Sequence, residues 1–360
     1  MKILTVLGTR PEIIRLSRVI ERLDWACHHV LVHTGQNYDP SLRDLFLDEL
    51  GVRRPDHYLG VRGDGFGETV GQIIAATEHV LRAKRPDRVL VLGDTDSGLA
   101  AFVARRLGIP VYRMEAGNPC FDDRVPEEAN RRVIDHMSDV LLPCTERSWA
   151  NLLAEGIPSR RIYVTGNPIY EVLEHHGAAI DRSNALQRLG VKSGGYFLVT
   201  LHRQENVDLP DRLRLLAESL ERVATDFARP VLWTMHPRTR DRLTRSGLTL
   251  DEARITVVPP AGLPDFVRLE RDAYCILSDS GTVPEECCIL GVPTVTLRDV
   301  TERPETVECG SNILSGAETA SVLRCVRIAL DRRGTWVPLS EYLRENVGGT
   351  VANIMLGYRP

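Results

Sequence analysis

The sequence lacks the features that mark membrane and nucleic-acid-binding proteins. No apolar run approaches the roughly 20 residues of a membrane span, and the first residues, MKILTVLGTRPE, become charged too soon for a signal peptide and resemble a strand. The 45 Lys and Arg residues do not outnumber the 49 Asp and Glu, so the net charge is −4. Without a basic surplus, we expect neither a nucleic-acid nor a membrane partner.

Metal and cofactor motifs are also scarce. None of the eight cysteines forms a CxxC pair, and no GxGxxG opens the first helical stretch. Three of the cysteines sit in apolar runs, where a small buried thiol is the usual state. This pattern predicts a reduced, cytoplasmic protein with no zinc or other metal site and no cofactor.

The chain has 360 residues, 43% of them apolar, which is enough for two domains with sizeable cores. Short, continuous aliphatic runs alternate with helical patterns such as 67–83 and 211–226, which is typical of parallel sheets covered on both faces. The predicted strands are 3–7, 30–33, 89–92, 111–114, 140–142, 196–200, 231–234, 255–258, 274–277 and 294–297.

This alternation is interrupted once, by a polar helical stretch between TGNPIYEVL and Tyr196. We therefore predict an α/β protein with two Rossmann-like domains, 1–168 and 169–338, and a helical segment, 339–360, that returns to the first domain. Parallel α/β sheets bind ligands beyond the carboxyl ends of their strands. The cleft between the two domains is the expected active site.

The first strand is followed by GTRPE, and TERPE occurs near the other end of the chain. Thr9, Pro11 and Glu12 suit the start of a helix. Arg10 does not, because a cation at the positive end of a helix dipole is unfavourable unless an anion is present. With Arg15 nearby, this helix start is a candidate phosphate site.

Carboxylates follow the next strands of the first half. Asp94 lies two residues past the predicted strand 89–92, Glu115 directly follows the strand 111–114, and Glu127 and Glu128 lie beyond that second strand. An isolated acid at a strand end often caps a helix, but several acids converging on one edge shift each other's pKa values and suit acid–base chemistry. A divalent-metal site is the alternative, although an anionic ligand held by arginines does not require one.

The strand ends of the second half carry cations and a turn with free amides that could hold a diphosphate at a helix start. Glu286, in the helix after that turn, is within reach of a ribose diol; the alternative is a buried capping or salt-bridging acid. The candidates in this half are His202, Arg203, His236, Ser280, Gly281 and Glu286.

Ten motifs over nearly the whole chain resemble, in order, those of the non-hydrolysing UDP-N-acetylglucosamine 2-epimerase family: GTRPE, HTGQ, GDT, EAG, PEEANRR, TGNP, the histidine at 202, SDSG with EE, GVP and TERPE. The resemblance implies two Rossmann-like domains of the glycosyltransferase-B type, a homodimer, a UDP-sugar substrate and UDP bound to the second domain.

For the first domain, the resemblance implies that Arg10 and Arg15 face the diphosphate and sugar, with arginine replacing the family's usual lysine at position 15. Asp94, Glu115 and Glu127 match the catalytic acids, and either the base or the acid role remains open for each. For the second domain, the resemblance implies that His202 contacts the phosphates and is one of the catalytic residues. It further implies that Ser280 and Gly281 form the phosphate-binding turn. Glu286 would contact the ribose, Arg303 the diphosphate and Phe266 the uracil.

The implied reaction interconverts UDP-GlcNAc and UDP-ManNAc through anti elimination of UDP to a 2-acetamidoglucal and its re-addition. Residues 63–75 lack the Arg-Gln pair of members that a second UDP-GlcNAc activates, and HTGQNYD, EAGNPCFDDRVPEE and SDSGTVPEE are closer to the branch acting on UDP-2-acetamido-2,6-dideoxyhexoses. That branch is the first alternative. A glycosyltransferase, a hydrolysing epimerase and a non-catalytic nucleotide-sugar sensor are the others.

Overall fold

The computed structural model describes residues 1–36 and 40–357 and divides into two compact units. Unit 1 comprises Met1–His175 and the segment that begins at Ser340, and unit 2 comprises His176–Leu339. Each unit contains one six-stranded sheet in which every neighbouring pair of named strands is parallel. The prediction of two Rossmann-like α/β domains is therefore confirmed.

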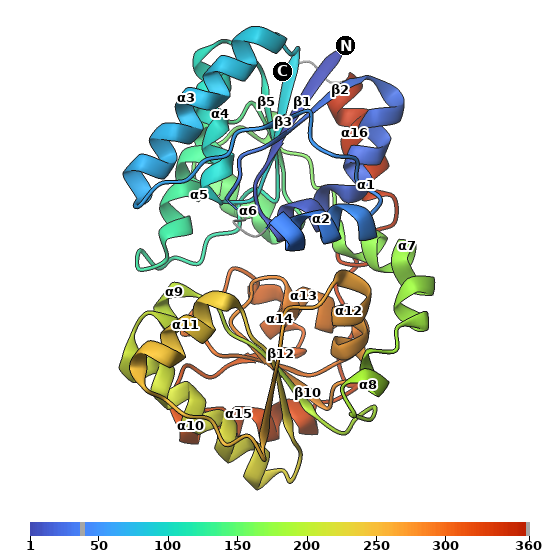
Figure 1. Cartoon of the computed structure of the whole chain (residues 1–360). Coiled ribbons are helices and arrows are strands. Elements are labelled where there is room, and N and C mark those ends of the chain that lie inside the picture. Colours follow the sequence, from blue (N-terminus) through green and yellow to red (C-terminus); the bar gives the residue numbers. More distant parts are fainter. Residues whose placement is uncertain (37–39, 358–360) are drawn as a thin grey trace. The chain divides into compact units, whose positions relative to one another are not determined.

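In unit 1 the strand order is β3-β2-β1-β4-β5-β6, with helices packed along the sheet (Figure 1). Its strands are β1 (Lys2–Leu7), β2 (His28–His33), β3 (His57–Tyr58), β4 (Arg88–Leu92), β5 (Val111–Met114) and β6 (Val140–Leu142). Its helices are α1 (Arg10–Ala26), α2 (Pro40–Glu49), α3 (Phe66–Lys84), α4 (Ala100–Arg106), α5 (Pro126–Met137), α6 (Glu146–Ala154), α7 (Ile169–Arg182), which runs into unit 2, and α16 (Val347–Gly357), with 3-10 turns η1 (Asp96–Leu99) and η2 (Ser159–Arg161).

Unit 2 repeats this topology, with the order β12-β11-β10-β7-β8-β9. Its strands are β7 (Phe197–Thr200), β8 (Val231–Thr234), β9 (Ile255–Val258), β10 (Cys275–Ser278), β11 (Thr294–Thr296) and β12 (Asn312–Leu314). Its helices are α8 (Ala185–Arg188), α9 (Gln204–Val207), α10 (Pro210–Asp226), α11 (Pro237–Ser246), α12 (Leu263–Arg271), α13 (Val283–Leu290), α14 (Pro304–Glu308) and α15 (Thr319–Asp331).

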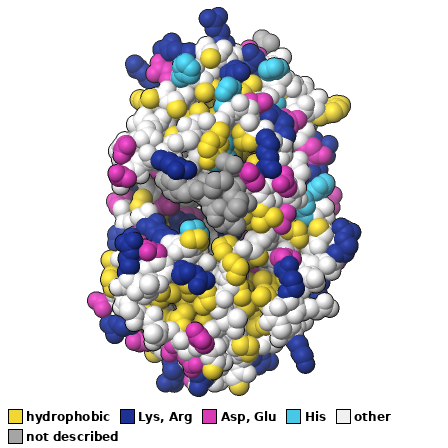
Figure 2. Space-filling view, viewed as in Figure 1, with side chains coloured by type: hydrophobic (Ala, Val, Ile, Leu, Met, Phe, Trp, Pro, Cys, Tyr) yellow, Lys and Arg dark blue, Asp and Glu magenta, His cyan; other side chains and the backbone are white. Residues whose placement is uncertain are grey.

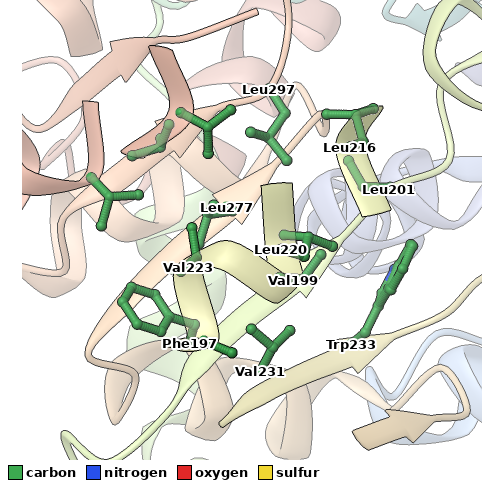
Figure 3. Packing of buried hydrophobic residues seen from close by; sticks show 14 of the residues in the cluster. Phe197, Val199, Leu201, Leu216, Leu220, Val223, Val231, Trp233, Leu277 and Leu297 are labelled. Atoms are coloured by element: carbon green, nitrogen blue, oxygen red, sulfur yellow. The ribbon is translucent and has the colours of Figure 1, made fainter. Parts of the chain in front are cut away.

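The strands form because their aliphatic residues are buried on both faces of the sheet. In unit 2, Phe197 and Val199 of β7 and Trp233 of β8 pack with Leu220 of α10 in one apolar cluster, as Figure 3 shows. All four side chains are fully buried. Burying a large apolar side chain contributes about 1.5–3 kcal/mol, and this core fixes the strand ends that carry the candidate site residues.

The C-terminal segment packs on unit 1, where α16 lies beside α1 (Figure 1). Its helix begins only at Val347, although a helical pattern was expected from 339. Two features keep the segment before Val347 from being helical. Asn346 has a left-handed φ of 56°. The backbone amide of Asn167 donates to the Glu341 carbonyl at 2.9 Å, which holds the preceding segment in a non-helical path.

Acidic and basic side chains are interspersed on the face shown in Figure 2, in keeping with the small net charge. Within the described part of the chain, no helix is long and apolar enough to cross a membrane.

Candidate active site

The β1–α1 loop of unit 1 is held by Glu12. Its carboxylate accepts hydrogen bonds from the Gly8 and Thr9 amides at 2.6 and 2.8 Å, and from the Thr95 hydroxyl, in the loop after β4, at 2.6 Å. Burial raises the pKa of Glu12, while these hydrogen bonds oppose the rise. Glu12 therefore joins the GTRPE and GDTD loops at the carboxyl edge of the sheet.

The two arginines of this helix start differ in environment. Arg10 is partly exposed, and its guanidinium carbon lies 5.3 Å from the centre of the Phe46 ring. Arg15 is only 1% exposed, and its guanidinium makes an ion pair with Glu115 at 2.7 Å. Arg15 therefore lies against one of the predicted catalytic acids.

Glu115 follows β5 with a φ of 60°, in the left-handed region that costs a residue with a side chain about 1–3 kcal/mol. Asp94 lies in the loop after β4, the strand that pairs with β5, at the same edge of the sheet, and it is partly exposed. Burial lowers the pKa of Arg113, and the charges of Asp135 and Asp94 oppose this effect. Asp94 is thus close enough to the buried Arg113 to favour its charged form.

The structure separates the two glutamates at the start of α5. Glu128 is 3% exposed, accepts from the Cys120 amide at 3.0 Å and makes an ion pair with the buried Arg131 at 3.0 Å. Glu127 is partly exposed. Glu128 is therefore a structural group, which leaves Glu127 as the candidate for contact with a ligand.

A polar network at this edge was not predicted from the sequence. The Gln36 side chain donates to Asp96 at 3.1 Å, and Asn130 donates to the other Asp96 oxygen at 2.9 Å. Gly8 permits the close approach here, because a Cβ at that position would lie 2.1 Å from the hydroxyls of Ser97 and Thr34. In the sequence, the motifs HTGQ and GDTD, which end at Gln36 and Asp96, were the signal that could have predicted this network.

In unit 2, the fully buried Asp279 organises the loop after β7. It accepts from the His202 and Arg203 amides at 3.0 Å and from the Asn206 side chain at 3.1 Å. The His202 Nδ1 lies 3.2 Å from the same carboxylate. Asp279 therefore fixes the orientation of the His202 ring, a positioning role that the sequence analysis did not assign to the SDSG motif.

A second set of charges surrounds the SDSG turn. A Cβ on Gly281 would lie 3.3 Å from Arg203 and 3.6 Å from Glu302, so backbone and guanidinium approach closely here. Although burial raises the pKa of Glu302, the charges of Arg203 and Arg298 outweigh it and set the pKa at about 2. The Ser280 hydroxyl accepts from the Thr282 amide at 3.2 Å and is partly exposed at the start of α13.

Of the remaining candidates of unit 2, Arg303 and Glu286 are buried, Phe266 is partly exposed and His236 is exposed. Arg303 is 7% exposed and pairs with Glu285 of α13 at 2.5 Å. Glu286 is 5% exposed, and Phe266 packs against an apolar cluster beneath α12. His236 caps α11 by accepting from the Arg238 amide at 3.2 Å, and its ring centre lies 6.4 Å from that of His202.

Each unit thus gathers its own set of polar groups at the carboxyl edge of its sheet. Unit 1 gathers carboxylates and two arginines, which suit proton transfer beside an anion. Unit 2 gathers a histidine, arginines and a serine–glycine turn, which suit a diphosphate. Among residues 1–36 and 40–357, no three His, Cys, Asp or Glu side chains are grouped so as to hold a metal ion.

Residues 22–356 match the family model described as UDP-N-acetylglucosamine 2-epimerase. The UDP-N-acetylglucosamine 2-epimerase of Methanocaldococcus jannaschii is 40% identical over 93% of this chain and 94% of its own. The crystal structure of that organism's enzyme with UDP-GlcNAc and UDP superposes with a TM-score of 0.94, at 38% identity over 99% of both chains. The UDP-2,3-diacetamido-2,3-dideoxy-D-glucuronate 2-epimerase of Pseudomonas aeruginosa is 36% identical over 92% of this chain and 93% of its own.

Proposed function

Because the chain belongs to the UDP-N-acetylglucosamine 2-epimerase family, we propose that it interconverts UDP-GlcNAc and UDP-ManNAc without hydrolysing them. The observation that carries the proposal is the full-length similarity to the M. jannaschii enzyme, whose crystal structure contains UDP-GlcNAc and UDP. The placement of acids in unit 1 and of cations with a phosphate-type turn in unit 2 supports it.

The chemistry determines what the site must supply. The C2 hydrogen of an acetamido sugar is not acidic, because no carbonyl stands beside that carbon, so direct inversion through a carbanion is implausible. Loss of the C2 proton together with UDP from C1 gives a 2-acetamidoglucal, which can be protonated on its opposite face and recapture UDP. This route requires a base, an acid and cations that hold the departing diphosphate.

In the proposal, the acids of unit 1 move the proton. Asp94, Glu115 and Glu127 share the base and acid roles, and Arg15 holds the Glu115 carboxylate in place through their ion pair at 2.7 Å. The strained backbone of Glu115 is in keeping with a functional position. Arg10, partly exposed at the start of α1, contributes positive charge for the diphosphate.

Unit 2 would hold UDP. The SDSG turn with Ser280 and Gly281 would bind the diphosphate at the start of α13. Glu286 would accept hydrogen bonds from the ribose hydroxyls, and Phe266 would contact the uracil. The cations assigned to the diphosphate are His202, Arg203, His236 and Arg303. Since Arg303 is paired with Glu285, its net contribution depends on how far UDP binding loosens that pair.

The proposal also includes a homodimer, as the resemblance to the family implies, and a cytoplasmic location. The eight cysteines are all free thiols in the structure, which suits a reducing compartment.

Incubation with UDP-GlcNAc alone tests this function, with the products followed by proton NMR. We expect UDP-ManNAc to appear and free N-acetylmannosamine to stay absent, because UDP is recaptured rather than replaced by water. A glycosyltransferase would leave the substrate unchanged until an acceptor is added. A protein that ignores UDP-GlcNAc but epimerises a 6-deoxy or a 2,3-diacetamido analogue would instead belong with the branches that the sequence and the P. aeruginosa relative represent.

Regulation gives a separate prediction. Residues 63–75 lack the Arg-Gln pair associated with activation by a second UDP-GlcNAc, and Gln72 there donates to the Arg62 carbonyl and to Glu68 at 2.9 and 3.1 Å. We therefore expect UDP-ManNAc to be converted without added UDP-GlcNAc. A lag in UDP-ManNAc consumption that a trace of UDP-GlcNAc abolishes would contradict this expectation.

A further inference from the structure

Two cysteines from different helices of unit 2 face each other. Cys288 lies in α13, Cys309 follows the last residue of α14, and these helices lie side by side (Figure 1). The two sulfur atoms are 3.7 Å apart. Since a disulfide bond is about 2.05 Å long, forming one would require the sulfurs, now 3.7 Å apart, to approach by about 1.7 Å.

The two thiols differ in exposure and acidity. Cys288 is fully buried, whereas Cys309 is partly exposed. The hydrogen bond between the two thiols lowers the pKa of Cys309, although partial burial opposes the shift. In the neighbouring Cys287, burial instead raises the pKa of the thiol well above its ordinary value. Cys309 therefore has the accessibility and thiolate character of an attacking cysteine, and Cys288 has the position of a resolving one.

We propose that Cys288 and Cys309 form an oxidation site that a peroxide converts into a disulfide, and that this bond lowers turnover at the nucleotide site. The first part stands on the geometry of the pair alone, and the second rests on the proposed function.

The reaction is balanced with hydrogen peroxide as the oxidant. The Cys309 thiolate attacks one peroxide oxygen, the O–O bond breaks, and Cys309 becomes a sulfenic acid while hydroxide leaves. The sulfur of Cys288 then attacks the sulfenic sulfur, the S–O bond breaks, and the thiol proton of Cys288 accompanies the departing oxygen as water. The proton that Cys309 lost on ionising converts the hydroxide into a second water. Two thiols are thus oxidised by two electrons in total, and the peroxide is reduced to two waters.

The bond would join two elements that carry proposed UDP contacts. Helix α13 follows the Ser280–Gly281 turn directly and contains Glu286. Helix α14 begins after Arg303, which already pairs with Glu285 of α13 at 2.5 Å. Drawing the two helices together would shift these groups relative to each other, and misplacing a positioned group by about 1 Å can cost about 10²-fold in rate.

Mass spectrometry of the full chain tests the oxidation site. After brief peroxide treatment, we expect tryptic peptides 272–298 and 299–324 to be joined, two hydrogens lighter than their sum, with fragmentation placing the link at Cys288. Cys309→Ser and Cys288→Ser should each remove the link, while Cys325→Ser, a matched change at another buried thiol of unit 2, should retain it. A link that persists in Cys288→Ser, or Cys309 oxidised without any link, would overturn the proposal.

Activity tests the second part. We expect peroxide to lower kcat/KM for UDP-GlcNAc about tenfold or more in the wild type, given the rate cost of misplaced groups. Dithiothreitol should restore it, and Cys309→Ser should resist the loss. A fully linked protein with unchanged turnover would refute the regulatory effect and leave the oxidation site standing. Reduced protein that never converts UDP-GlcNAc would instead refute the proposed function, while the peptide link still decides the oxidation site.

Discussion

Replacing Arg10 by alanine is expected to lower kcat about 10²–10³-fold, the usual effect of removing one group that stabilises charge developing in a transition state. Negative charge grows on the diphosphate as the C1–O bond breaks, and Arg10 stands partly exposed at the carboxyl edge of the unit 1 sheet. Stability must be measured beside kcat, because Arg10 also contacts the ring of the buried Phe46 at 5.3 Å, a cation–π contact worth about 0.5–2 kcal/mol.

Steady-state kinetics and thermal unfolding together check this prediction. Arg18→Ala is the matched control, because Arg18 lies on the same helix and pairs with Glu21, away from the strand ends. Its kcat should stay near the wild-type value. If Arg10→Ala retains near-normal turnover, Arg10 has no part in stabilising the leaving group.

Arg303 is a less direct test of the same idea. It pairs with Glu285, and both side chains are buried. Removing one partner of a buried ion pair typically costs about 3–5 kcal/mol of stability, because the other charge is left without compensation. A loss of activity in Arg303→Ala would therefore mix unfolding with chemistry, a problem that is smaller for the partly exposed Arg10.

The sequence predicted most of the fold, because continuous aliphatic runs identify strands that are buried on both faces. Each of the ten predicted runs overlaps a strand of the structure. The strands β3 and β12 were missed. They contain only two and three residues, and neither His57–Tyr58 nor Asn312–Leu314 forms an aliphatic run. Both lie at sheet edges, where pairing with one neighbour defines the strand.

The sequence also identified which loops carry polar groups, but it could not assign partners to them. Strand order alone brings Asp94 and Glu115 to adjacent positions. The choice between neighbouring glutamates depends on packing: Glu128 faces the buried Arg131, and Glu285 faces Arg303 at the start of the next helix, α14. Asp279 is another such case, since its role arises only when the β7 and β10 loops meet.

Replacing Glu127 by glutamine is expected to slow turnover by about 10²–10⁴-fold, the usual contribution of a positioned acid or base. Glutamine keeps the shape of the side chain and removes the ionisable group. UDP affinity, measured by titration calorimetry, should survive, because its proposed contacts lie in unit 2 at Ser280 and Glu286. Glu128→Gln is the control, since Glu128 neutralises the buried Arg131, and this variant should show its main effect as a lower Tm.

The same pair of variants tests the elimination itself when the reaction runs in D₂O. The wild-type product should gain deuterium at C2, because the abstracted proton resides on a carboxylate that exchanges with solvent, and prolonged incubation should release some 2-acetamidoglucal and UDP. Glu127→Gln should slow deuterium incorporation as much as it slows epimerisation if Glu127 moves the proton at C2. Incorporation at the wild-type rate would reassign that step to Asp94 or Glu115. A wild-type product without deuterium would instead exclude abstraction by an exchanging group and remove all three carboxylates from the mechanism.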